Sequence, residues 1–280
     1  MNSENAYKKA LIFAREHYEN FPVVSFLIRK EIRRDVAIIY WFARTADDLA
    51  DEGNYSENER LENLEKFENR LNNLLNDKFE SEFDMALAKS IKTRNLNPAH
   101  FYNLLKAFKQ DVVKKRYAAF SEVEGYCRNS ANPVGRLILE LHDIRNEEAF
   151  RCSDDICTSL QLTNFYQDTA IDFKKGRIYY PLDEMEKFNV VEKMFLLKEN
   201  NSNLRKLVKF STNRTKKLFE NGKNLLRYLD GRLKMEIKWT ILGGEKILRK
   251  IEENNFDVIQ QRPVLTKSDF TWLIIKSFLI

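Results

Sequence analysis

Scarcity of turn-forming residues constrains the fold of this chain more than any other feature of its sequence. The 280 residues include only 8 glycines and 5 prolines, and the alternation of apolar and polar residues that marks strands is almost absent. Glycine and proline end many regular elements, so the elements here are expected to be long. The sequence therefore predicts an all-α protein, in which one core buries about three quarters of the surface of the unfolded chain.

Apolar periodicity places the expected helices along the chain. They fall near residues 5–18, 32–52, 56–76, 80–95, 98–119, 121–143, 146–175, 203–228, 230–253 and 266–279. A capping box, Ser56 followed by Glu59, begins the third of these helices. No internal repeat or long linker interrupts the pattern, so residues 1–280 are expected to form a single domain.

The charge balance narrows the class of partner. The 47 basic and 42 acidic residues give a net charge of +5, and no dense basic tract with interleaved aromatic residues appears. A nucleic acid is therefore not expected as a partner, whereas anionic membrane headgroups and diphosphates suit a mildly basic surface. The cysteines are odd in number and lack the C-x-x-C spacing of zinc sites: Cys127, Cys152 and Cys157. We therefore expect reduced thiols in the cytoplasm.

The two ends of the chain bear on its location. The first residues, MNSENAYKKA, lack the apolar core of a signal peptide, and no apolar run is as long as a membrane-spanning helix requires. We expect a soluble, cytoplasmic protein. The apolar end FTWLIIKSFLI (270–280) is expected either to pack on the core or to touch a membrane, which would place the protein peripherally on the inner membrane surface.

Two pairs of aspartates carry the strongest chemical signal. Asp47 and Asp51 lie in the apolar segment VAIIYWFARTADDLADE, and Asp168 and Asp172 lie in CTSLQLTNFYQDTAIDFKKGRIYYP. Residues i and i+4 share one face of a helix, so each pair directs two carboxylates at the same point. Such like charges destabilise a helix and resist burial unless a cation lies between them.

Other polar residues extend these two faces. Tyr40 and Arg44 share the stripe of the first pair, and Gln161 and Asn164 share that of the second. Hard oxygen ligands suit Mg²⁺, which proteins often hold through a few carboxylates and the phosphates of a substrate. Nearby cations would bind the remaining phosphate oxygens: Arg44, Lys174, Lys175 and Arg177. The pattern predicts a diphosphate site, because a merely solvated acidic face would have to arise twice in apolar sequence.

One interruption of the helical pattern is the sequence SANPVG (130–135). Pro133 lacks a backbone donor and frees the carbonyl group one turn earlier, near Asn129. The segment is either an ordinary helix junction or a place where this carbonyl and the Asn132 amide face a positively charged intermediate. His17 gains no role from the residue pattern alone.

These motifs resemble those of the squalene/phytoene synthase family of head-to-head isoprenoid synthases. The resemblance covers nearly the whole chain, through HYENFPV, FARTADDLADE, YCRNSANPVG, QLTNFYQDTAIDFKKGRIYYP and QQRPVL. Two acidic motifs at this separation, the second followed by G-R-I-Y, are highly specific. The combination is most similar to the bacterial hopanoid-pathway branch of hydroxysqualene synthases.

The resemblance implies a helical isoprenoid-synthase bundle around a central apolar cavity, with Mg²⁺ at its mouth. It implies that Asp47, Asp51, Asp168 and Asp172 hold ions that bridge to diphosphate, with Asp48, off the main stripe, as a weaker candidate. By the same matching, the diphosphate and prenyl sites are lined by His17, Tyr40, Arg44, Gln161, Asn164, Arg177, Tyr179 and Arg262.

Three positions depart from the pattern of dehydrosqualene- and phytoene-forming relatives. Gln167 stands where many of them have an arginine, Ile171 where an acidic residue is common, and Glu245 where some have a tyrosine. Loss of a phosphate-binding arginine disfavours a reaction in which the site binds two prenyl diphosphate substrates. The neutral Gln167 amide could bind a water that captures a cation, or it could instead hold a neighbouring helix.

The expected reaction is therefore conversion of presqualene diphosphate and water to hydroxysqualene and diphosphate, without NADPH. Alternatives within the family are condensation of two farnesyl diphosphates to presqualene diphosphate, and complete squalene, dehydrosqualene or phytoene synthesis. The absence of a glycine fingerprint for a dinucleotide mildly disfavours a reductive squalene synthase. Outside catalysis, the chain could be an assembly protein on the same fold, or a membrane-surface protein whose acidic stripes bind ions only structurally.

Overall fold

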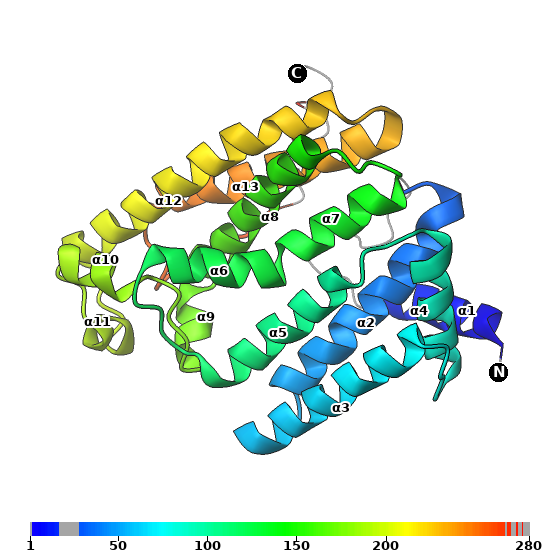
Figure 1. The fold of residues 1–280 in the computed structure, drawn as a ribbon. Coiled ribbons are helices and arrows are strands. Elements are labelled where there is room, and N and C mark those ends of the chain that lie inside the picture. The colour runs from blue at the N-terminus through cyan, green and yellow to red at the C-terminus, as the bar shows by residue number, and fades with distance from the viewer. Residues whose placement is uncertain (1, 17–27, 267, 270–272, 274–275, 277–280) are drawn as a thin grey trace. The chain divides into compact units, whose positions relative to one another are not determined.

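The structure is a computed structural model that describes residues 2–16, 28–266, 268, 269, 273 and 276. These residues form helices joined by turns, and none of them lies in a strand (Figure 1). The prediction of an all-α protein is confirmed. No helix in this part of the chain is long and apolar enough to cross a membrane.

The chain divides into two compact units, and the first lies within residues 1–113 and 133–146. Helix α2 packs against α1, α3, α4 and α5, which makes it the central helix of this unit. The helices are α1 (Ser3–Glu16), η1 (Lys30–Ile32), α2 (Arg33–Asp51), α3 (Glu57–Leu75), α4 (Glu82–Thr93), α5 (Ala99–Val113) and most of α7 (Asn132–Leu141). The organisation of residues 1–280 as a single domain stays a prediction.

The apolar face of α2 forms the centre of the first core. Phe42 and Ala46 are buried, and the Phe42 ring packs against Phe67 of α3 at 5.0 Å and Phe101 of α5 at 5.2 Å between ring centroids. Burying one such aromatic side chain contributes about 1.5–3 kcal/mol to folding. The apolar periodicity of the sequence thus explains why α2 occupies the centre.

A buried polar network joins α1, α2 and α4. Asp35 is 1% exposed, and its carboxylate accepts hydrogen bonds from Ser90 Oγ at 2.7 Å and from Arg94 Nε at 2.9 Å. The Tyr7 hydroxyl lies 2.8 Å from Ser90 Oγ. A buried charge is costly unless it is paired, so this network restricts how the three helices can meet.

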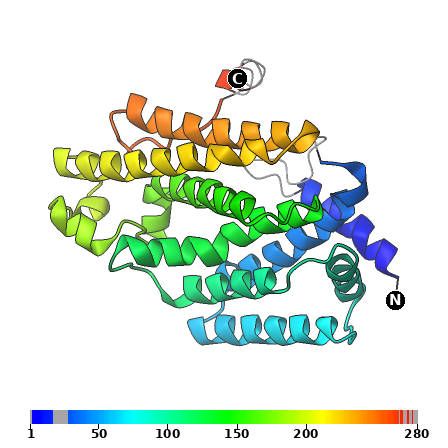
Figure 2. The same cartoon turned by 45° about the horizontal axis from the view of Figure 1, so that its top comes forward.

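The second unit lies within residues 114–132 and 147–280. Helix α8 packs against α6, α12 and α13, and α12 and α13 run side by side in both ribbon views (Figures 1 and 2). The helices are α6 (Phe120–Ser130), α8 (Glu147–Gln167), α9 (Thr169–Lys174), α10 (Leu182–Lys187), α11 (Glu192–Leu196), α12 (Ser202–Gly222), η2 (Lys223–Arg227) and α13 (Gly231–Glu253).

Small residues bring α8 and α12 close together. Ser159, Thr163 and Thr215 are buried, and their hydroxyls donate to carbonyl groups one turn earlier at 2.6, 2.7 and 3.0 Å. Each hydroxyl donor thus has a hydrogen-bond partner, and its burial leaves no donor unpaired. At Gly222 an added Cβ would lie 2.6 Å from Ile156 Cγ1 of α8, closer than any real contact.

The predicted helix 98–119 ends early, at Val113. The residues after Val113 instead pair with the backbone of residues 178–182. Ile178 N–H donates to the Lys115 carbonyl at 3.1 Å, and Leu182 N–H donates to the Tyr117 carbonyl at 2.8 Å. This long-range pairing takes the place of local helical bonds, and local periodicity does not reveal it.

Two further predicted helices are each divided in the structure. The segment 121–143 breaks at Ala131, two residues before the proline of SANPVG, and the segment 146–175 breaks at Asp168. Ser56 and Glu59 form both hydrogen bonds of the predicted capping box. The predicted helix 266–279 lies largely outside the described residues.

We predict that Gly222→Ala lowers the free energy of unfolding by about 1–3 kcal/mol, because the new methyl group overlaps the facing helix. Gly125→Ala in α6 is the matched control, since nothing lies within 4 Å of its added Cβ. There the substitution is expected to stabilise by about 0.5–1 kcal/mol, as a helix interior gains an alanine. Urea unfolding measures both variants, and equal effects would contradict the close approach of α8 and α12.

Candidate active site

The first acidic motif lies in the last turns of α2. Asp47, Asp48 and Asp51 are partly exposed, while Ala46 and Ala50 of the same turns are buried. The C-terminal end of a helix carries partial negative charge, so carboxylates there are unfavourable and a cation is favourable. The position of the motif therefore suits a site that binds a metal ion.

Two arginines offset this negative charge. Arg44 Nε lies 2.8 Å from Asp48 Oδ1, and Arg44 Nη1 lies 3.6 Å from Asp47 Oδ2. Arg60 of α3 donates to the carbonyl groups of Ala50 at 2.9 Å, Glu52 at 2.9 Å and Gly53 at 2.8 Å, which satisfies the end of α2. Arg44 could be predicted from the sequence, whereas Arg60 could not, because only tertiary contact brings Arg60 to this helix end.

The second acidic motif lies where α8 gives way to α9. Asp168 is the residue between the two helices, with φ −101° and ψ 13°, and Asp172 follows in α9. The Asp172 N–H donates to the Asp168 carbonyl at 2.8 Å, so one helical turn is preserved across the break. The predicted i, i+4 relation of these two aspartates is present in the backbone.

A residue far along the chain meets this motif. Arg262 Nε lies 2.5 Å from Asp168 Oδ1, and Arg262 Nη2 lies 3.3 Å from Asp168 Oδ2. The neighbouring Gln167 is 4% exposed, and its Nε2 donates to the Pro263 carbonyl at 2.6 Å. The amide thus fixes the backbone directly after Arg262 and thereby the position of the guanidinium.

Three predicted site residues gather around one small cavity. Asp172, Arg177 and Tyr179 line a space of about 10 Å³, roughly what one water needs, together with Phe165, Thr169, Ile178, Tyr180 and Phe195. Arg177 is placed there by its own backbone, because its N–H donates to the Asp172 carbonyl at 2.9 Å. A carboxylate, a guanidinium and a phenol therefore meet at the end of the second motif.

An aromatic cluster surrounds Tyr179. Its ring stacks on Phe165 at 3.5 Å between centroids, and the rings of Tyr117 and Tyr126 follow at 5.8 and 6.1 Å. Burial raises the pKa of Tyr180, next in sequence, far above its ordinary value, so its phenol stays protonated. Tyr179 was predicted through the family motif, whereas its ring partners carry no signal of their own in the sequence, since buried aromatic residues usually belong to the core.

The remaining predicted residues are placed as follows. Tyr40 is half-buried, and its ring centroid lies 6.1 Å from that of Phe13. Gln161 is half-buried and Asn164 exposed, both on α8, and His17 lies outside the described residues. Asn132 is buried and accepts a hydrogen bond from Thr158 Oγ1 at 3.0 Å, which supports an ordinary helix junction at SANPVG.

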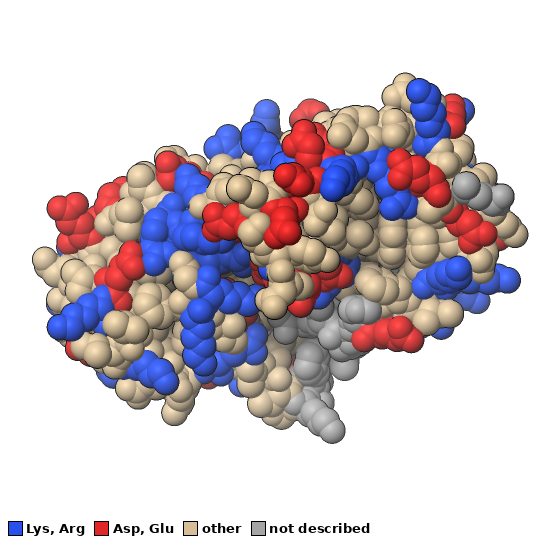
Figure 3. Space-filling view, turned by 90° about the horizontal axis from the view of Figure 1, so that it is seen from below, with Lys and Arg blue, Asp and Glu red and all other residues tan. Residues whose placement is uncertain are grey.

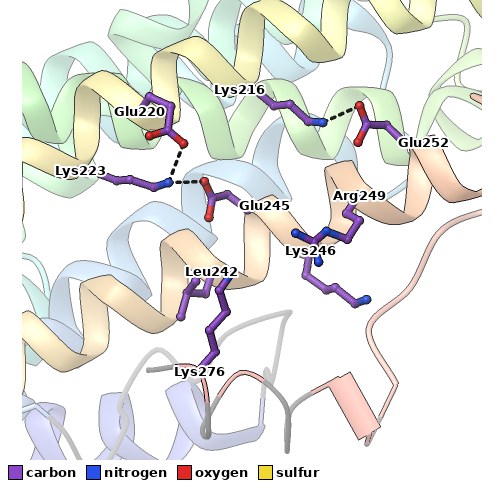
Figure 4. A pocket seen from close by; sticks show the side chains of 9 residues that line it. All are labelled: Lys216, Glu220, Lys223, Leu242, Glu245, Lys246, Arg249, Glu252 and Lys276. Carbon is purple, nitrogen blue, oxygen red and sulfur yellow. Dashed lines mark hydrogen bonds and ion pairs between the residues drawn. The ribbon is translucent and has the colours of Figure 1, made fainter. Parts of the chain in front are cut away.

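A second pocket, of about 310 Å³, lies on the surface of α12 and α13 (Figure 4). Glu245 lies in it and pairs with Lys223 at 2.7 Å, and Lys216 pairs with Glu252. Glu245, which the family resemblance matched to a tyrosine of some relatives, is therefore part of a charged surface network. Of the predicted diphosphate and metal residues, none lines this pocket.

The metal-binding capacity of the two motifs follows from their donor chemistry. Within the described residues no group of three or more His, Cys, Asp or Glu side chains is arranged as a ready-made metal site. Each motif nevertheless supplies two carboxylates four residues apart, which fits Mg²⁺, a cation that completes its coordination with water and phosphate oxygens. The residues present therefore fit this ion.

Comparison with known proteins identifies the family of this chain. The family model for squalene/phytoene synthase matches residues 14–269. A hydroxysqualene synthase from Rhodopseudomonas palustris is 32% identical over 262 residues, which are 93% of this chain and 87% of that protein. A 15-cis-phytoene synthase from Synechocystis is 29% identical, with 92% of this chain and 80% of that protein covered.

A solved structure agrees with both the fold and the family. The crystal structure of squalene synthase HpnC from Alicyclobacillus acidocaldarius is similar with a TM-score of 0.86 at 31% identity, covering 91% of this chain and 96% of that chain. The range matched by the family model includes both acidic motifs and Arg262. The resemblance expected from the motifs is confirmed, and this chain belongs to the squalene/phytoene synthase family.

Proposed function

We propose that this chain ionises presqualene diphosphate and captures the resulting cation with water, giving hydroxysqualene and diphosphate. The observation that carries the proposal is the presence of all four motif aspartates in a chain similar to a hydroxysqualene synthase along nearly its whole length. Water supplies the new hydroxyl group and releases one proton, so the reaction consumes no reductant.

The motif aspartates are proposed to hold Mg²⁺. Asp47 and Asp51 offer carboxylates from α2, and Asp168 and Asp172 offer them from the junction of α8 and α9. When bound, the ions supply Lewis-acid stabilisation of the departing diphosphate.

Cationic side chains of the chain are proposed to bind the remaining diphosphate oxygens. Arg177 lies beside Asp172, and guanidinium groups match phosphate oxygens with paired donors. Lys174 and Lys175 are exposed at the end of α9 and add positive charge near the same carboxylate. Arg44 is proposed to exchange its aspartate partners for diphosphate once a metal neutralises those carboxylates.

The aromatic cluster around Tyr179 is proposed to face the carbocation. Stacked Phe165 and Tyr179 present rings that attract positive charge without supplying a nucleophile. Such a wall excludes stray water, so that capture depends on one positioned molecule.

Gln167 is proposed to position Arg262 and not to hold the reacting water. Its side chain is buried and its amide N–H is committed to the Pro263 carbonyl. Of the two roles expected from the sequence, binding a water or holding a neighbouring helix, this assignment favours the second. The segment that Gln167 holds is the loop at Pro263 and not a helix.

A second candidate function is condensation of two prenyl diphosphates. The similarity to a phytoene synthase over 92% of the chain favours it, as does the squalene synthase named among the solved structures. The alternative of a non-catalytic assembly protein gains no support from the sequence, because no motif carboxylate has been replaced.

Product analysis separates these candidates. We predict that purified protein with Mg²⁺ converts presqualene diphosphate to a C30 alcohol that contains ¹⁸O when the water is labelled, without NADPH. Farnesyl diphosphate alone is expected to give little product. Mass spectrometry identifies the products, and a hydrocarbon or efficient formation of presqualene diphosphate from farnesyl diphosphate would assign the chain to the other branch.

Removal of single motif carboxylates tests the metal assignment. We predict that Asp47→Asn, Asp51→Asn and Asp172→Asn each lower kcat about a hundredfold or more, the size of losing a key electrostatic contact. The thermal unfolding temperature of the metal-free protein should rise slightly, since like-charge repulsion is relieved. Asp183→Asn, an exposed aspartate of α10, is the control. Wild-type turnover in two of the three motif variants would refute the assignment.

The geometry of Arg262 is tested by keeping its charge. We predict that Arg262→Lys lowers kcat/KM about tenfold, because lysine cannot reproduce the forked contact with Asp168. Arg151→Lys, in an exposed ion pair with Glu148, is the matched control and should behave as wild type. If both lysine variants retain full kcat/KM, the contact between Arg262 and Asp168 does not contribute to the reaction.

A further inference from the structure

Exposed apolar side chains concentrate in one stretch of the second unit. Among the described residues, twelve large apolar side chains are classed as exposed, and five of them lie between positions 171 and 197. They are Ile171, Leu182, Val191, Leu196 and Leu197. Single exposed apolar residues need no explanation, but such a concentration in about a tenth of the chain does.

The two exposed leucines that follow Phe195 are held outward by the packing of that residue. Leu196 is 68% exposed and Leu197 is 53% exposed, whereas Phe195 beside them is buried. The Phe195 ring packs against Phe173 of α9 at 5.7 Å and Tyr180 at 6.2 Å between centroids. Anchoring Phe195 in this way prevents α11 from turning its leucines toward the core.

An arginine locks the start of α11. Arg116 Nε and Nη2 lie 2.6 and 2.7 Å from the two carboxylate oxygens of Glu192, and Arg116 Nη1 donates to the Gly176 carbonyl at 2.6 Å. This forked contact ties α11 to the loop that follows α9. The exposed leucines therefore belong to an ordered surface.

Lysines accompany the exposed apolar residues. Lys174, Lys175, Lys193 and Lys198 are exposed in the same stretch. Two of its acidic residues are already paired with arginines from outside it, Glu192 with Arg116 and Glu184 with Arg214. Figure 3 shows Lys and Arg side chains gathered with uncharged surface on the left part of the face, where α9 and α11 lie in Figure 1.

We propose that this surface, formed by Ile171, Val191, Leu196 and Leu197 with Lys193 and Lys198, docks on a membrane that contains anionic lipid. Apolar side chains at the tip enter the boundary of the acyl chains while lysines bind headgroups, the combination that interfacial segments use. A second protein copy fits less well, because lysine is depleted at the core of protein interfaces.

The docking surface lies next to the second acidic motif. Phe173, whose ring packs against that of Phe195, directly follows Asp172 in α9. If the proposed function holds, a water-insoluble C30 substrate and product would pass between the bilayer and the site over a short path. The membrane contact itself is argued from α9 and α11 alone and does not require that reaction.

Sedimentation with lipid vesicles tests the docking surface. The full-length protein is expected to sediment with vesicles of phosphatidylcholine and phosphatidylglycerol, less with phosphatidylcholine alone, and less in high salt. Leu196→Gln with Leu197→Gln should lower the partition coefficient at least about tenfold, because two leucine side chains no longer enter the acyl chains of the bilayer. Ile12→Gln with Val113→Gln, exposed to a similar extent in the first unit, should bind as the parent protein.

Two outcomes would overturn the proposal. Unchanged sedimentation of the Leu196→Gln/Leu197→Gln protein, with circular dichroism matching the parent, would assign membrane contact to another part of the chain. A dimer in light scattering that this double substitution converts to a monomer would identify a second copy as the occupant. Neither readout involves substrate, so failure here is distinct from failure of the proposed reaction.

Discussion

The packing of α8 against α12 is the contact on which the second unit and its acidic motif depend. The buried hydroxyls of Ser159 and Thr163 donate to carbonyl groups of α8 itself, and no space for a side chain remains at Gly222 between the two helices. Because α8 ends at Gln167, this packing fixes where the chain turns at Asp168. The position of a charged residue is thus set by an uncharged contact several turns away.

Charge placement works against stability at both motifs. Aspartates at the end of α2 oppose the helix dipole, and Arg44 and Arg60 offset that cost locally. At the second motif, Arg262 does the same for Asp168. Sequences that break a local rule and then compensate for it commonly do so at functional sites, which is how we interpret these arginines.

Much of the fold could be predicted from the sequence because it depends on local pattern. The core face of α2 and the Ser56–Glu59 capping box follow from periodicity and residue type alone. The early end at Val113 could not be predicted, since it depends on backbone pairing with residues near Ile178.

The candidate site divides in the same way. The i, i+4 aspartates are visible in the sequence, whereas the contact between Asp168 and Arg262 joins residues 94 positions apart. Only the family motif suggested Arg262, and nothing in the sequence indicated that Gln167 would hold the adjacent Pro263 carbonyl. Pairing over such distances is decided by tertiary packing.

Binding of diphosphate by the aspartate motifs through a metal is best measured by isothermal titration calorimetry with inorganic diphosphate. We predict saturable binding of diphosphate in the presence of Mg²⁺ that weakens about tenfold or more when the metal is removed, because each ligand raises the affinity for the other. The Asp168→Asn/Asp172→Asn protein should lose this metal dependence while keeping its helical content. Equal affinity for diphosphate with and without Mg²⁺ in the unmodified protein would show that no metal joins the motifs to diphosphate.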